Sequence, residues 1–252
     1  MNTPVVSPVV TQLRARIDQL EGGPARRRDV LPFGVAEIDA VLPGGGLAMG
    51  ALHEVVGGGN GTVDGAVAAL FTAGLAARAK GKILWCITQQ DLFAPSLAQA
   101  GLAPGRVIYV EAGNEADALA CAEEGLRHGG LGAIVCEVAK LSMIASRRLQ
   151  LAAERTGTLA LVIRRWRRQA EASNFGQPTA AVTRWRISAL PSSPLPVPGV
   201  GRARWRVELI RCRTGSADIE VEACDAKGCL AIPADLADRS AAADIRRHNR
   251  AS

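Results

Sequence analysis

Aromatic side chains and long apolar runs are scarce in this chain of 252 residues. Aromatic residues make up only 4% of it, whereas hydrophobic residues make up 48%. The composition therefore disfavours a β-sandwich with an aromatic-rich core and excludes a disordered chain. No apolar run reaches the roughly 18 residues that a membrane-spanning helix needs, and residues 1–10 lack the basic flank and apolar stretch of a signal peptide. We expect a cytoplasmic protein with no membrane partner.

Residue patterns for metal binding and for nucleophilic catalysis are also missing. The six cysteines include no C-x-x-C pair, and Cys224 and Cys229 have no second pair nearby, so we expect no zinc site. Ser142 lacks a G-x-S-x-G setting, and the three histidines match no triad or metal spacing. The cysteine pattern is typical of a reduced protein of the cytosol.

Lysine is rare as well. The formal net charge of +6 comes almost entirely from arginine, and the lysines are Lys80, Lys82, Lys140 and Lys227. A basic balance of this size permits contact with nucleic acid or with an acidic partner. It is equally compatible with an arginine-rich genome composition.

Strand-like and helix-like segments alternate along the middle of the chain. Apolar runs predict strands at 51–56, 83–88, 106–110, 133–138 and 159–164, with helices at 63–79, 91–100, 115–127 and 142–154 between them. Unbroken apolar strands are typical of a parallel sheet that is covered on both faces. Further on, residues 183–190, 202–213 and 218–225 alternate polar and apolar residues, which predicts antiparallel strands extending the sheet. The fold class is therefore α/β, with a mostly parallel sheet, flanking helices and antiparallel C-terminal strands.

We expect three parts in the chain. Residues 1–29 form an N-terminal helical arm and linker, residues 30–230 form the core, and residues 231–252 form a basic C-terminal tail.

A glycine-rich turn follows the first apolar strand and precedes a helix, which is a common setting for phosphate binding. The turn contains, in order, Gly57, Gly58, Gly59, Asn60, Gly61 and Thr62. A hydrolysing P-loop, G-x-x-x-x-G-K-[ST], also needs a lysine for the terminal phosphates and a hydroxyl for magnesium. No alignment of the motif supplies that lysine, and Asp64 places a negative charge nearby. The turn is either an altered nucleotide site or a turn that only packs the helix.

Several segments, in order, resemble the core of RecA. The entry segment 31–57 carries Gly34, Asp39, the Gly45-Gly46-Leu47 run, Gly50 and Glu54. Residues 84–102 resemble the next strand and helix of RecA, residues 131–141 resemble its Walker B strand, and residues 160–190 resemble the strand that enters its second DNA-binding loop. The resemblance covers roughly residues 30–225 and implies a RecA-like fold with a degenerate P-loop.

The departures from RecA all affect ATP hydrolysis. Gln90 stands where RecA has the glutamate that orients the attacking water, and glutamine cannot take a proton. Glu137 replaces the Walker B aspartate and can still hold a metal through water. Arg165 stands near the glutamine that senses the terminal phosphate. We therefore expect no catalytic residues, no cofactor and no ATP hydrolysis.

The combination of a short arginine-rich core, a lost lysine and a C-terminal tail is similar to the ImuA family of bacterial mutagenesis cassettes. The resemblance implies a role in damage-induced, SOS-type translesion DNA synthesis. It also implies partners: an ImuB-like homologue of Y-family polymerases, an error-prone DNA polymerase, and RecA or DNA itself.

A basic cluster follows the last strand of the parallel sheet, where the RecA-like core exposes its second DNA loop. The cluster consists of Arg164, Arg165, Trp166, Arg167 and Arg168. Its arginines can hold phosphates and its tryptophan can stack on an unpaired base, so we predict a DNA-binding or partner-binding role. The alternative is a tryptophan packed in the core with solvated arginines, and this alternative is favoured for Trp185 and Trp205 in their Arg-Trp-Arg patterns.

These observations predict a non-catalytic adaptor in error-prone translesion synthesis. Two alternatives stay open: an ATP-binding modulator of RecA filaments, for which Glu137 and the glycine-rich turn are the supporting features, and a cell-division inhibitor of the SulA type. The fold by itself does not separate the three, because one fold hosts many functions.

Overall fold

The computed structural model describes residues 12, 29–59, 61–166, 176–192 and 198–233. The expected arm at 1–29 and tail at 231–252 lie almost entirely outside these residues. The strands are β1 (Val30–Leu31), β2 (Leu47–Ala48), β3 (Leu52–Gly57), β4 (Ile83–Ile87), β5 (Val107–Glu111), β6 (Ala133–Val138), β7 (Leu159–Arg164), β8 (Thr183–Leu190), β9 (Arg204–Arg211) and β10 (Ala217–Glu222). The helices are α2 (Ala36–Asp39), α3 (Gly61–Arg78), α4 (Ala94–Gln99), η1 (Pro104–Arg106), α5 (Glu115–His128) and α6 (Met143–Thr156).

A mixed sheet of eight strands forms the centre of the molecule, in the order β10-β9-β8-β3-β7-β6-β4-β5. Strands β8, β3, β7, β6, β4 and β5 run parallel, whereas β9 and β10 are antiparallel to their neighbours. The expected α/β class, with a mostly parallel sheet and antiparallel C-terminal strands, is confirmed.

One strand differs from its expected orientation. We expected residues 183–190 to be antiparallel to the core, but β8 pairs in parallel with β3 and is antiparallel only to β9. A parallel neighbour needs a crossover of a dozen or more residues. The segment between Arg164 and Thr183 is long enough to carry the chain back to the end of the sheet at which the parallel strands begin.

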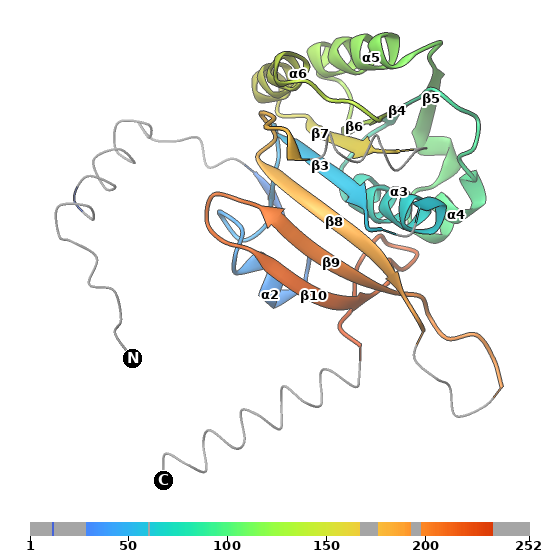
Figure 1. Ribbon diagram of the computed structural model, residues 1–252. Coiled ribbons are helices and arrows are strands. Elements are labelled where there is room, and N and C mark those ends of the chain that lie inside the picture. The colour runs from blue at the N-terminus through green and yellow to red at the C-terminus, as the bar shows by residue number, and fades with distance from the viewer. Residues whose placement is uncertain (1–11, 13–28, 60, 167–175, 193–197, 234–252) are drawn as a thin grey trace.

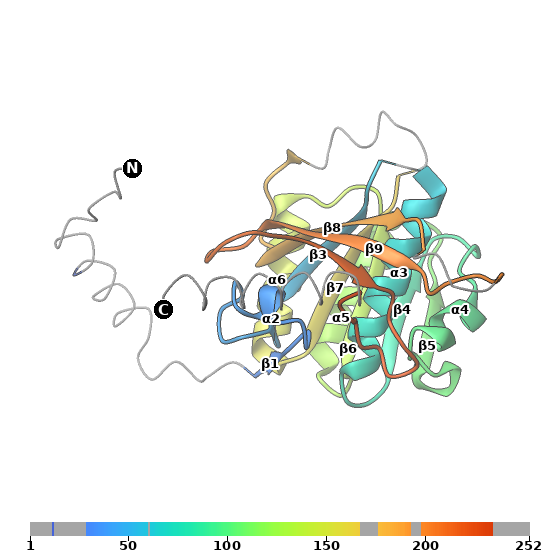
Figure 2. The ribbon, with the colours of Figure 1, turned by 90° about the horizontal axis from the view of Figure 1, so that it is seen from below.

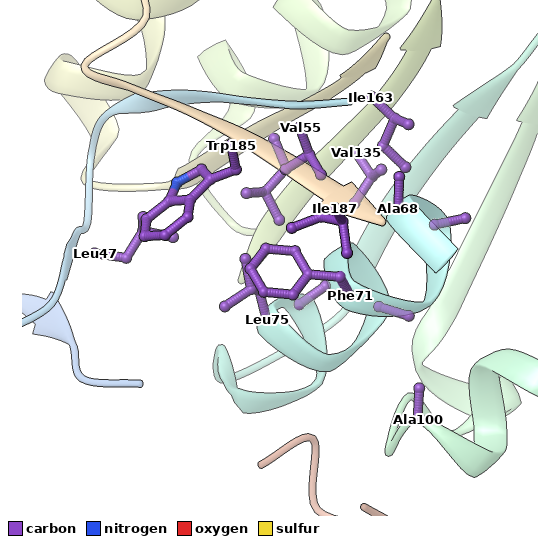
Figure 3. Packing of buried hydrophobic residues seen from close by; sticks show 14 of the residues in the cluster. Leu47, Val55, Ala68, Phe71, Leu75, Ala100, Val135, Ile163, Trp185 and Ile187 are labelled. Carbon is purple, nitrogen blue, oxygen red and sulfur yellow. The ribbon is translucent and has the colours of Figure 1, made fainter. Parts of the chain in front are cut away.

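Helices cover both faces of the parallel part of the sheet (Figure 1, Figure 2). Helices α5 and α6 pack on one face, over Cys86, Cys136 and Val162, and helices α3 and α4 pack on the other. On the α3 face, Phe71 and Leu75 meet Val55 and Trp185 of the sheet (Figure 3). Trp185 and Trp205 are buried in this core, as their alternation with arginine along the strands predicted.

Helices α5 and α6 begin at capping side chains and end at glycines. The Asn114 side chain accepts a hydrogen bond from Asp117 N at the start of α5, and Ser142 accepts one from Ala145 N at the start of α6. Gly129 and Gly157 end these helices with φ of 72° and 75°, a conformation in which glycine carries no steric penalty.

Candidate functional site: a filled cleft at the strand ends

The carboxyl ends of the parallel strands form the edge at which open α/β sheets bind ligands. At this edge β3 leads into the glycine-rich turn and α3, and β4 leads to Gln90 and Asp91. Glu137 lies near the end of β6, and Arg164 and Arg165 lie at the end of β7. The register pairs Glu137 with Ile163 and Val138 with Arg164. The topology therefore brings most of the candidate residues to one edge of the sheet.

The turn itself is shorter than a P-loop. Strand β3 ends at Gly57 and helix α3 begins at Gly61, so the fourth of the four positions after the first glycine of the motif is already helical. A side chain added at Gly57 would meet the backbone of Asp64 at 2.7 Å. The start of α3 is therefore packed directly against the end of the strand. Asn60 lies outside the described residues.

The side chain of Asp64 packs against this turn. This side chain is buried, with 3% of the residue exposed, and its Oδ1 accepts a hydrogen bond from Ala189 N at 2.8 Å. A Cβ atom at Gly58 would lie 2.6 Å from Asp64 Oδ2 and in contact with Ser188 Oγ. An aspartate in the first turn also complements the positive end of the helix dipole. The negative charge that this helix end favours is thus supplied by the chain itself.

The lysine position of the motif gives no cation. Counted from Gly57, it falls on Val63, whose side chain is 51% exposed. Thr62 beside it is also exposed, at the first turn of α3. None of the four lysines of the sequence lies in α3 or in the turn before it.

Glu137, the Walker B position, is fully engaged by protein groups. Its Oε1 accepts a hydrogen bond from Trp85 Nε1 at 2.7 Å, and its Oε2 accepts one from Arg165 Nη1 at 2.7 Å. Arg165 also donates two hydrogen bonds to Asp91, at 2.9 and 2.8 Å. Burial disfavours the charged guanidinium, but Glu137 and Asp91 outweigh it, and the pKa of Arg165 is raised above its usual value.

The arginine therefore lies between the two carboxylates and balances their negative charge. Gln90, the expected remnant of the catalytic glutamate, lies beside this pair and donates to Glu111 Oε2 at 2.5 Å. In the described part of the chain, no group of three or more histidine, cysteine, aspartate or glutamate residues has a geometry that could hold a metal ion.

Arg164 has a different environment from the one we expected. It is 2% exposed and belongs to a buried cluster around Glu54. Its Nη1 lies 3.0 Å from Glu54 Oε1, and Arg184 Nε lies 2.7 Å from Glu54 Oε2. Arg164 also donates to Ala139 O at 2.8 Å. The expectation that Arg164 is exposed in a DNA loop is wrong, because both faces of β7 are covered and the guanidinium pairs with the buried Glu54.

The rest of the basic cluster is only partly described. Arg165 is paired with Glu137 and Asp91, and Trp166 is half-buried just after β7. Arg167 and Arg168 lie outside the described residues. A DNA or partner role for Trp166, Arg167 and Arg168 stays a prediction.

Sequence reasoning missed the residues that pair with the candidate side chains and with Glu54. Trp85, Asp91, Arg184 and Ala189 were not recognised as partners, because each is remote in sequence from the group that it contacts. One signal was available: glutamate at a position inside an apolar strand, as for Glu54 and Glu137, requires a buried partner.

Comparison with known proteins places the chain in a family. It is 40% identical over 206 residues to Protein ImuA of Caulobacter vibrioides strain NA1000, which covers 78% of this chain and 84% of the relative. The chain belongs to the ImuA family. Protein ImuA of the C. vibrioides strain ATCC 19089 matches with the same identity and coverage, whereas no protein-family model matches.

A solved structure supports the fold of this ImuA-family chain. The crystal structure of the RadB recombinase superposes with a TM-score of 0.54 at 18% identity, and the match covers 81% of this chain and 99% of that one. The RecA-like fold is therefore confirmed. No helix in the described ranges is long and apolar enough to cross a membrane.

Proposed function

We propose that this chain is a non-catalytic RecA-like adaptor in damage-induced, error-prone translesion DNA synthesis in the cytoplasm. Its partners are an ImuB-like homologue of Y-family polymerases and, through it, an error-prone DNA polymerase, with RecA or DNA as further contacts. Membership of the ImuA family supports the pathway. The observation that carries the absence of catalysis is the filled cleft, in which Asp64 and Arg165 stand against the groups that would otherwise meet nucleotide and metal.

Electrostatics argue against a retained triphosphate. A charge pair about 4 Å apart is worth of order 4 kcal/mol at an effective dielectric near 20. Loss of the P-loop lysine removes one such attraction, and the buried Asp64 carboxylate adds a repulsion of similar size. Glu137 is not available to a metal while Arg165 occupies its Oε2. These terms together disfavour binding by several powers of ten in the dissociation constant.

The deciding experiment is a titration of the full chain with a fluorescent ATP analogue in magnesium, alongside a steady-state ATPase assay. We expect neither binding nor turnover, with an active RecA-type ATPase as the positive control in the same buffer. Binding without turnover would make nucleotide a structural ligand. Turnover above the background of a Glu137→Ala variant would overturn the non-catalytic assignment and favour the filament-modulating ATPase.

Partner binding is tested separately. We expect the purified chain to bind the ImuB-like protein in a pull-down, and we expect deletion of its gene to lower damage-induced mutation. Filamentous cells on overexpression, with an unchanged mutation rate, would instead support the SulA-type inhibitor and contradict the proposal.

A separate set of variants tests the proposed DNA contact of the basic cluster. Trp166→Ala and Arg167→Ala/Arg168→Ala are predicted to weaken binding of a labelled single strand, with Arg213→Ala as the matched arginine control elsewhere on the core. If all of these variants bind the strand as the unaltered chain does, direct DNA contact through the cluster is excluded.

A further inference from the structure

The outer face of α6 carries two large apolar side chains in solvent. Ile144 is 74% exposed and Leu151 is 60% exposed. They are seven residues apart, so they lie on the same face of the helix, about 10 Å from each other. The opposite face of α6, with Leu149 and Ala153, is buried against the sheet. Single exposed apolar residues are common on protein surfaces, but two on one helical stripe form a pair of anchor points for a partner.

Arginine side chains surround this stripe. Arg147, Arg148 and Arg155 share the exposed side of α6. Arg148 and Arg127 of the neighbouring helix α5 both pair with Glu123, which is nearly buried between the two helices. That carboxylate orients two guanidinium groups that are otherwise more than half exposed. Arginine is enriched at protein interfaces because its stem covers apolar surface while its fork binds carboxylates.

A hollow continues the surface toward the carboxyl ends of the helices. Helices α5 and α6 lie side by side over one face of the sheet (Figure 1). Between them is a hollow of about 480 Å³, lined by Arg127, Ala152, Arg155 and Thr156. Arg155 belongs both to the hollow and to the basic border of the stripe, so the two features form one surface. We call it the α6 surface: Ile144, Leu151, Arg147, Arg148, Arg155 and Arg127.

The charges around the α6 surface indicate which kind of partner segment binds there. The border of the α6 surface is made of arginines. Among the described residues, Glu123 pairs with Arg127 and Arg148, and Glu154 is the nearest acidic neighbour along α6. By contrast, the strand face formed by β9 and β10 pairs its charges internally, through Arg204–Glu220 and Arg206–Asp218. The excess positive charge of the α6 surface is therefore complementary to carboxylates.

We propose that the α6 surface docks an acidic segment of the polymerase-like partner, with two apolar side chains packed on Ile144 and Leu151 and carboxylates paired with Arg147 and Arg155. The proposal rests on the proposed function for the identity of that partner. It places the contact on the face of the sheet opposite to α3, away from the filled cleft.

The test measures binding of the purified ImuB-like protein to the full chain by biolayer interferometry. Ile144→Asp/Leu151→Asp removes the anchors, and Arg147→Glu/Arg155→Glu reverses the border. Val200→Asp, at a residue 95% exposed between β8 and β9, and Arg213→Glu are the matched controls. Circular dichroism and thermal melting of each variant establish that it is folded.

We expect each α6 double variant to weaken binding at least about tenfold, the range of interface hot spots, while the controls bind as the unaltered chain does. Binding of the unaltered chain should fall as salt rises, and the Arg147→Glu/Arg155→Glu variant should lose most of that dependence.

The other outcomes separate the possible failures. If the unaltered chain binds the partner and the folded α6 variants bind equally well, the α6 surface is not the site and the proposed function stands. If the unaltered chain does not bind the partner, both fall. Loss of binding to a labelled 30-nucleotide single strand in the arginine variant, with partner binding intact, would assign the surface to DNA. A dimer of the unaltered chain that becomes monomeric in the α6 variants on sedimentation would assign it to a second copy. Either result overturns the proposal.

Discussion

Glu54→Gln tests the buried charge cluster that draws Arg164 away from the surface. Glu54 is fully buried and accepts hydrogen bonds from Arg164 Nη1 at 3.0 Å, from Arg184 Nε at 2.7 Å and from Thr179 Oγ1 at 3.0 Å. Glutamine keeps the shape of the side chain but removes its negative charge. The variant would remove the negative charge that pairs with the buried guanidinium groups of Arg164 and Arg184.

The expected loss of stability follows from the burial of Glu54, Arg164 and Arg184. Removal of one partner from a buried ion pair costs about 3–5 kcal/mol, because the remaining charge stays desolvated. Domains of this size have free energies of unfolding of roughly 5–15 kcal/mol. At about 2–4 °C for each kcal/mol, the melting temperature should fall by roughly 10 °C.

Urea unfolding followed by circular dichroism measures the effect. The matched control is Asp218→Asn, which removes the negative charge of the exposed pair with Arg206 and should cost far less than Glu54→Gln, because solvent screens exposed ion pairs. In a double-mutant cycle, Glu54→Gln should cost less in an Arg164→Met background than in the unaltered chain. A loss under about 1 kcal/mol for Glu54→Gln would refute the reasoning, since the cluster would then be hydrated or rearranged.

Three further predictions concern other buried polar groups. Burial lowers the pKa of His53 from 6.5 to about 4, so the folded state favours the neutral ring. The free energy of unfolding should therefore fall by roughly 3 kcal/mol as the pH drops from 6.5 to 4. A His53→Gln variant should show a flatter pH profile in urea titrations. Asp64→Ala should lower the free energy of unfolding by about 1–2 kcal/mol, because Ala189 N loses its acceptor. Asp64→Asn keeps an acceptor and should lose less stability. Equal losses for the two variants would contradict the role of the hydrogen bond. Arg165→Ala should destabilise the chain by about 1–2 kcal/mol, as judged by thermal melting, because Glu137 keeps only its bond from Trp85, and it should gain no affinity for the fluorescent ATP analogue because no lysine is restored.

Much of the fold could be predicted from local sequence. The apolar runs at 83–88, 133–138 and 159–164 match β4, β6 and β7 to within one residue. They have this clarity because strands buried on both faces cannot carry unpaired polar residues. Helices α5 and α6 match the expected ranges 115–127 and 142–154 to within two residues, and the structure shows that Asn114 and Ser142 cap them and that Gly129 and Gly157 end them. The missing lysine and the poor fit to a P-loop also required no structure.

The orientation of β8 and the fate of the cleft could not be predicted in this way. Whether residues 183–190 run parallel or antiparallel depends on the path of the preceding segment, and alternation along the strand is the same in both cases. The basic cluster after β7 was read as one surface, yet Arg164 and Arg165 point to different partners. Local periodicity places a side chain on one side of a strand and does not say which side is covered.

The sequence alone therefore determined the α/β class, the bounds of α5 and α6 to within two residues and the absence of a hydrolysing lysine, because each depends on residues close together in the chain. Tertiary structure alone decided that Asp64 binds Ala189, that Arg165 joins Glu137 to Asp91, and that Glu54 holds Arg164 and Arg184. The exposed stripe on α6 was decided in the same way, by what the sheet covers and leaves bare. Sheet register brings together groups separated by up to 130 residues, and whether a charge is buried with a partner or left in solvent depends on that register.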